Sequence, residues 1–98
     1  MYSAPVQLPP RSLTAVPFMG AMVAIHVAAP QGQIVDVFVT DDHNLQQLRA
    51  KRAFNSHGAA RGGQVRKTVM LPHSGPWHLV VYNPGAETAT VQVGYAPF

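Results

Sequence analysis

The chain contains no cysteine, few charged residues and a single tryptophan, and each shortage narrows what the protein can be. Without cysteine, its 98 residues can form no disulfide, no thiolate metal site and no cysteine nucleophile. Charged residues make up 11% of the sequence, against about 25% in an average soluble protein. So few charges favour a surface that is partly covered by a partner or by a second copy of the chain.

Length and hydrophobic content suit one small domain with one core. The 98 residues are 47% hydrophobic. In a chain of this size, the free energy gained by burying apolar surface nearly equals the entropy cost of ordering the chain. Self-association would add stability, so we expect a homo-oligomer. Residues 1–12 contain three prolines and are expected to form an N-terminal arm, either loose or extended along a sheet edge. Residues 13–98 should form the domain.

The longest uncharged stretch, Leu13–Ala29, resembles a membrane segment only superficially. It is shorter than the roughly 20 residues that a spanning helix needs, and it contains Pro17 and His26. Cleavage of a signal peptide after Ala29 would leave Pro30 next to the cut. We therefore expect a strand here, no contact with a membrane, and a cytoplasmic protein.

Period-two alternation of apolar residues predicts strands in the first and last thirds of the chain. The expected strands are 18–29, 34–40, 64–71, 77–82 and 88–95. Residues 34–40 are apolar on both faces, which is typical of a central strand. Proline- and glycine-containing turns separate the strands. The pattern predicts an all-β fold, a small antiparallel β-sandwich of six to eight strands, jelly-roll-like, with one short helix.

The middle of the chain has a different character. Asp41 or Asp42 can cap a helix, and Leu45 and Leu48 then lie on one helix face. We expect a short helix over residues 42–53. Residues 55–63, with the sequence NSHGAARGG, are expected to form a glycine-rich loop.

Several of these segments together resemble a family of small bacterial domains of unknown function. The most specific part is the S-G-x-W-H motif at residues 74–78, and the resemblance covers residues 18–95. The other matching residues are Asp41, Asn44, Leu45, Leu48, Gly58, Gly62, Gly63, Val69, Leu71, Pro72, Leu79 and Val81. The resemblance implies a β-sandwich and, for some members, a neighbouring TIR domain. It implies no activity and no site residues.

Positive charge is concentrated in one part of the sequence. Six of the seven basic residues lie between residues 49 and 67, with no acidic residue among them. Arg49, Arg52, Arg61 and Arg66 are therefore candidates to bind an anionic ligand or an acidic protein partner, assisted by backbone N–H groups of the loop. The simpler alternative is that cations gather at a helix end. Only Phe54 lies among them and no nucleic-acid-binding motif is present, so nucleic acid is not an expected partner.

Trp77 has two interpretations. It is in register with Leu79 and Val81, which predicts that it packs at the end of the core with its indole N–H on a backbone carbonyl. Alternatively, Trp77 and His78 form a half-exposed rim, with His73 and Ser74 nearby, that binds a carbohydrate or another small ligand.

Catalytic and metal-binding patterns are weak. The five histidines lack ligand spacing, so neither a metal nor another cofactor is expected. Ser74 is not in a nucleophile elbow, and a set such as Asp36, Ser74 and His78 has no spacing to support it. The sequence thus favours a non-enzymatic, self-associating binding module; a purely structural oligomer protomer is the remaining alternative.

Overall fold

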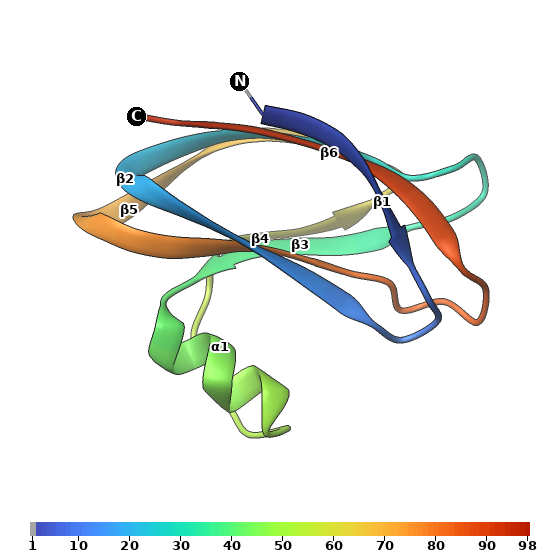
Figure 1. Cartoon of the computed structure of the whole chain (residues 1–98), viewed down its shortest axis with the longest axis horizontal. Coiled ribbons are helices and arrows are strands. Elements are labelled where there is room, and N and C mark those ends of the chain that lie inside the picture. The colour runs from blue at the N-terminus through green and yellow to red at the C-terminus, as the bar shows by residue number, and fades with distance from the viewer. Residues whose placement is uncertain (1) are drawn as a thin grey trace.

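The computed structural model describes residues 2–98, which form one six-stranded antiparallel sheet and one short helix (Figure 1). The elements are β1 (Tyr2–Leu8), β2 (Leu13–Ala28), β3 (Val35–Thr40), α1 (Asp42–Arg49), β4 (His57–Gly62), β5 (Gln64–Tyr82) and β6 (Ala89–Pro97). The strand order is β1-β6-β2-β5-β3-β4, so β1 and β4 are the two edges of a sheet that does not close. The predictions of an antiparallel β-fold and one short helix are confirmed; a division into two separate sheets is not seen.

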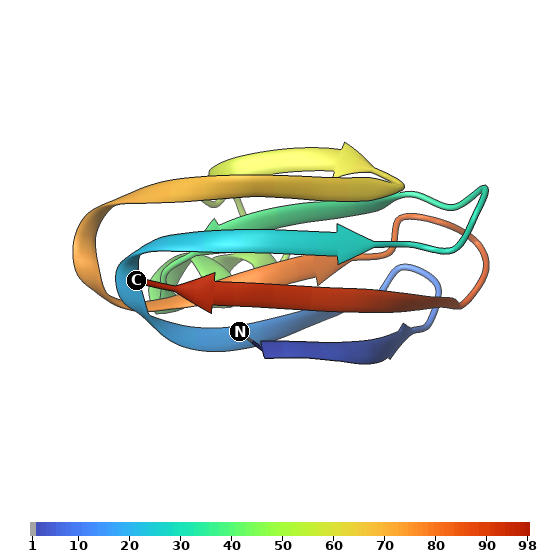
Figure 2. The ribbon, with the colours of Figure 1, turned by 90° about the horizontal axis from the view of Figure 1, so that it is seen from above.

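Two long strands, β2 and β5, form the centre of the sheet. They pair from Leu13 opposite Tyr82 to Ala28 opposite Gln64, with an irregularity between Gly20 and Met22. Figure 2 shows both strands curving round at one end of the molecule. The predicted division into two strands, 64–71 and 77–82, with a turn at residues 72–76 between them is therefore wrong. This stretch continues β5 through a bend, because β2 bends alongside it at a bulge.

Curvature of the sheet encloses the core. Figure 1 shows β1 and β6 on one side of the molecule and β3 on the other. Buried valines from all of the long strands fill the space between, and Trp77 and Phe18 complete it. Val35, Val37 and Val39 of β3 are fully buried there, which confirms the predicted central strand.

The helix α1 packs on the outer side of the sheet, where Leu45 meets Phe38 and Val80 in a second, smaller cluster. Asp41 caps its first turn by accepting a hydrogen bond from the Asn44 backbone N–H at 2.8 Å. The predicted end at residue 53 is wrong, because α1 ends at Arg49.

A C-terminal cap explains why α1 stops early. The Lys51 N–H donates to the Leu48 carbonyl at 3.0 Å, and the Arg52 N–H donates to the Gln47 carbonyl at 2.9 Å. Lys51 adopts a left-handed conformation with φ of 59°. This is the Schellman arrangement, with lysine in the place where glycine is the usual residue.

Both edge strands lie in segments that the sequence pattern left without a strand. Residues 2–8 form β1, so the expected arm lies along a sheet edge, where Pro5 is tolerated. The predicted loop at 55–63 is wrong, because residues 57–62 pair with β3 as β4. Glycine and alanine dominate β4 and give no alternation to detect.

Within residues 2–98, no helix has the length and apolar character needed to span a membrane. The uncharged stretch at 13–29 is strand β2 almost throughout.

Candidate functional site

A groove of about 670 Å³ lies between the end of α1, the β1–β2 turn and the outer side of the sheet. Figure 1 shows α1 on this side, with its C-terminal end directed toward the same end of the molecule as the β1–β2 turn. We call this feature the α1 groove. Its apolar lining is Leu13, Phe38, Leu48 and Phe54; its basic lining is Arg11, Arg49, Lys51 and Arg52; Ser12, Asp36 and Tyr82 complete it.

The apolar floor comes from strands β2 and β3, from α1 and from the segment that follows α1. Phe38 projects from β3 to the outer side, and Phe54 returns from the segment after α1 to pack against it, with ring centroids 5.5 Å apart. Leu48 comes from the last turn of α1 and is half-buried. The floor therefore forms only because the chain reverses after α1 and lays Phe54 back onto the sheet.

Two of the four cations in the groove occupy left-handed backbone positions. Arg11 has φ of 55° and Lys51 has φ of 59°, and these are the only non-glycine residues with positive φ in residues 2–98. Arg11 lies in a turn closed by the Ser12 N–H on the Pro9 carbonyl at 3.3 Å. Left-handed backbone costs a residue with a side chain roughly 1–2 kcal/mol relative to the right-handed form. Both positions therefore carry a cation where the backbone favours glycine.

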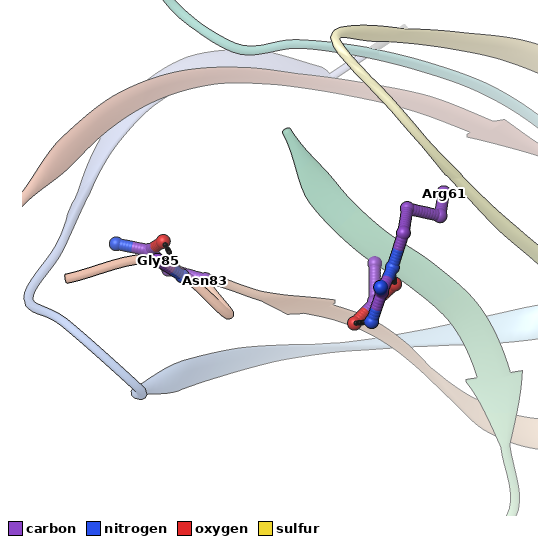
Figure 3. A network of polar contacts seen from close by, with 4 residues as sticks. Arg61, Asn83 and Gly85 are labelled. Atoms are coloured by element: carbon purple, nitrogen blue, oxygen red, sulfur yellow. Dashed lines mark hydrogen bonds and ion pairs between the residues drawn. The ribbon is translucent and has the colours of Figure 1, made fainter. Parts of the chain in front are cut away.

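The groove has no free carboxylate. Asp36 is the only acidic residue in its lining, and the Arg61 guanidinium binds it through two hydrogen bonds, Nε to Oδ1 at 2.5 Å and Nη2 to Oδ2 at 2.9 Å (Figure 3). The hydrogen bonds to Asp36 raise the pKa of Arg61. Throughout the described chain, no ion pair involves Arg11, Arg49, Lys51 or Arg52. The groove thus presents four uncompensated positive charges.

The four predicted arginines do not form one site. Arg49 and Arg52 lie in the α1 groove, as part of its basic lining. Arg61 does not line the α1 groove: β4 pairs with β3 and places Arg61 directly opposite Asp36, with which it forms an ion pair while its side chain stays 60% exposed. Arg66 lies elsewhere, beside Lys67 and His26 at a shallow depression on the other half of the sheet. The acidic partner of Arg61 is distant in sequence, so the local charge pattern could not reveal it.

Glycine-rich backbone does not provide the expected anion-binding loop. Gly58 and Gly62 belong to β4. Gly58 has φ of 65°, and a Cβ atom there would lie 2.5 Å from a methyl group of Val69. Gly58 is therefore required for close packing of β4 on β5.

Trp77 is a core residue. Its side chain is buried, with 2% relative exposure, and its indole N–H donates to the His73 carbonyl oxygen at 3.2 Å. The prediction of a core tryptophan bonded to a backbone carbonyl is confirmed. The alternative of a half-exposed ring beside His78 is contradicted, because a buried ring offers no free face to a carbohydrate.

Two histidines pack against the tryptophan. The His73 ring lies 4.9 Å and the His57 ring 5.4 Å from the Trp77 ring, centroid to centroid. His78 is directed away from them, with Nε2 3.3 Å from Asp42. Among residues 2–98, no group of three or more histidine or acidic side chains is arranged to hold a metal ion. His57 and His73 are therefore explained by their packing against Trp77 at the end of the core.

The possible catalytic set is not assembled. Thr40 lies opposite His78, four residues along β3 from Asp36, and Asp36 is bound by Arg61. Asp36 and His78 therefore cannot act on one Ser74 hydroxyl.

A second depression, of about 510 Å³, lies on the other side of Arg61. It is lined by the turns before β3 and before β6, including Asn83 and Gly85 (Figure 3). Hydrogen bonds within the protein occupy the Asn83 side-chain amide: it donates to the carbonyls of Leu8, Pro9 and Glu87 and accepts from the Gly85 N–H. This depression lacks the excess charge of the α1 groove and is the weaker candidate.

Arg11 is the residue that sequence analysis missed. It is the one basic residue outside the 49–67 cluster, and only the β1–β2 turn brings it to the groove. The pair Pro9–Pro10 marks a turn, and a basic residue directly after it was the available signal.

No protein-family model matches the chain, and no curated protein matches it significantly.

Proposed function

We propose that this protein is a non-enzymatic binding module and that the α1 groove binds an anionic ligand with an apolar part. One observation carries this proposal: Arg11, Arg49, Lys51 and Arg52 converge on an apolar groove that has no free carboxylate. Surface cations gain little from staying together, because like charges repel and a folded surface can separate them. An anion relieves that repulsion, and its apolar part covers the partly exposed floor.

The strained positions support the same proposal. A glycine at Arg11 or Lys51 would remove backbone strain and also remove a charge from the groove. Strain that persists at two positions, both lining one groove, is typical of a site where the side chain has a task. Neither residue makes an ion pair within residues 2–98, so an internal contact with an acid does not account for them.

The probe for a direct test is anilinonaphthalene sulfonate, a fluorescent sulfonate with an aromatic body. We expect its emission to rise on binding, and its affinity to fall as salt is added, because the cations are exposed and easily screened. The double variant Arg49→Gln with Arg52→Gln should bind about tenfold more weakly, since two charge contacts of roughly 0.5–1 kcal/mol each are lost.

A matched control has the same change in charge outside the groove. Arg66→Gln with Lys67→Gln also removes two positive charges, from the depression on the other half of the sheet. This control should stay within about twofold of the wild-type affinity. Equal losses in both double variants would mean that the probe responds only to net charge, and the proposal would be wrong. Absence of any binding to the wild type would also overturn it.

Self-association is a second candidate, favoured by exposed apolar side chains near the bend of β2 and β5. Met19 and Met70 are 67% and 74% exposed, and Phe98 is 60% exposed. Phe98 exchanges backbone hydrogen bonds with Met22, which lies opposite Met70 in the sheet. We propose that a second copy covers this patch. Light scattering should then show a dimer or larger oligomer that Met70→Glu converts to a monomer; a monomeric wild type at high concentration would contradict this.

Three sequence predictions accompany these proposals. We propose that the curved sheet is a jelly-roll-like sandwich, because one core cluster contains side chains from β1, β6 and β3 together. Membership of the bacterial domain family of unknown function and a cytoplasmic location are likewise proposals.

A further inference from the structure

We infer that the occupant of the α1 groove is an acidic segment of a partner protein, in which negative side chains flank an apolar residue. This inference rests on the function proposed above and narrows it to one class of ligand. It depends on where the cations come from, on how exposed the groove is, and on how its aromatic rings are packed.

The cations reach the groove from two separate parts of the chain. Arg11 comes from the β1–β2 turn, whereas Arg49, Lys51 and Arg52 come from the end of α1. Apolar side chains from β2, β3 and α1 lie in the same groove. A ligand that meets both groups of cations and also covers the floor needs at least two negative groups with an apolar part between them. A short peptide with acidic, apolar and acidic residues in order has this pattern.

The groove does not enclose its occupant as a small-molecule site would. Sites for small molecules surround most of the ligand and orient it with a few buried polar groups. None of the polar side chains in the groove is buried: Ser12, Asp36 and Tyr82 are all partly exposed. Asp36 is also occupied by Arg61. The groove therefore suits side chains that project from a larger partner.

Nucleic acid fits the groove less well than an acidic peptide. Single-stranded nucleic acid is bound by free aromatic faces on which bases stack. Two of the three aromatic rings of the groove pack on each other: Phe38 is buried, and Phe54 lies against it at a centroid distance of 5.5 Å. Tyr82 is the remaining aromatic residue and is partly exposed, and one ring alone cannot stack successive bases. A lipid surface also fits poorly, because the apolar side chains lie in a groove and would not insert into a bilayer.

The test uses fluorescein-labelled peptides and fluorescence anisotropy. The first peptide is Glu-Asp-Leu-Phe-Glu-Asp with blocked ends. The second has serine in place of leucine and phenylalanine, and the third has glutamine and asparagine in place of the acids. We expect the first peptide to bind at least tenfold more tightly than either control, because only it supplies both charge and apolar area.

Protein variants locate the binding. Arg11→Gln with Arg52→Gln removes one cation from each part of the chain that forms the groove, and it should weaken binding of the first peptide about tenfold. Arg66→Gln with Lys67→Gln removes the same charge outside the groove and should change the affinity less than about twofold. Circular dichroism of each variant checks that the fold is retained, and Arg49→Gln with Arg52→Gln provides a second groove variant.

Each result has a distinct meaning. If the sulfonate probe binds in the groove and the first peptide does not, the inference about the partner is wrong and the proposed function survives. If neither binds, both are wrong. If the first and second peptides bind equally, charge alone is recognised and the inference falls. Tighter binding of a single-stranded oligonucleotide or of anionic vesicles, lost in the same groove variants, would overturn it in favour of those ligands.

Discussion

Lys51 provides the sharpest test of the idea that the groove keeps its cations at a cost in stability. The residue follows the last turn of α1 with φ of 59° and is held there by the two hydrogen bonds of the helix cap. Its side chain is exposed and makes no ion pair within residues 2–98. Lys51→Gly should therefore relieve strain without breaking a contact.

The magnitude follows from two opposing terms. Left-handed backbone costs a residue with a side chain about 1–2 kcal/mol, which glycine avoids. The substitution also costs about 0.5–1 kcal/mol of stability, because glycine gives the unfolded chain more conformational freedom. We expect a net gain of about 0.5–1 kcal/mol in the free energy of unfolding. In a chain of this size that raises Tm by about 2–6 °C.

Thermal and urea unfolding, followed by circular dichroism, measure the change. Lys51→Ala is the matched control, because alanine removes the same charge but keeps a Cβ atom in the left-handed conformation. Its stability should stay within about 0.5 kcal/mol of the wild type. Both variants should bind the sulfonate probe equally weakly, since both lose one cation. If Lys51→Gly is no more stable than Lys51→Ala, the strain argument is wrong.

Three further predictions concern residues that hold the fold. Asn83→Ala should destabilise the protein by about 2–4 kcal/mol in urea unfolding, because its buried amide serves three carbonyls and one N–H; a cost under 1 kcal/mol would refute this. Gly58→Ala should cost about 2–4 kcal/mol, since the new Cβ would lie 2.5 Å from a valine methyl, whereas Gly32→Ala, with φ of 84° and open space, should cost only about 1 kcal/mol. Equal losses in the two glycine variants would show that packing is not the cause. The hydrogen bond from a backbone N–H lowers the pKa of Asp41 below 3.8, so its carboxylate stabilises the fold above that value and this contribution is lost as pH falls through the folded pKa. Asp41→Asn, which keeps a cap acceptor, should therefore lose less stability than the wild type below about pH 4, and parallel pH profiles would contradict the assignment.

Local patterns in the sequence determined the type and position of most elements. Alternation placed both ends of β3 and β6 closely and the end of β2 as well, because a strand with one buried face must repeat every two residues; β2 begins earlier than predicted, at Leu13. The acid-capped start of α1 was equally local, since Asp41 bonds the N–H three residues ahead. The role of Trp77 also followed from its register with Leu79 and Val81, which share its buried face.

Contacts between distant residues lay outside those patterns. β4 is held by its pairing with β3, so its glycine- and alanine-rich sequence needs no apolar alternation. The continuity of β5 through residues 72–76 depends on a bulge in β2, which is far away along the chain. The early end of α1 depends on the left-handed backbone conformation of Lys51. A residue with a side chain disfavours this conformation, so the sequence gives no reason to expect it at a lysine.

For the candidate site, the sequence by itself determined that the protein carries excess positive charge and where along the chain most of it lies. Only the tertiary structure decided which charges act together. Cross-strand pairing neutralises Arg61 with Asp36, and Arg66 lies on the other half of the sheet. The β1–β2 turn brings Arg11 to the end of α1. The physical reason is that electrostatic interaction depends on distance in space, and a folded sheet sets that distance by strand register, which separation along the chain does not reveal.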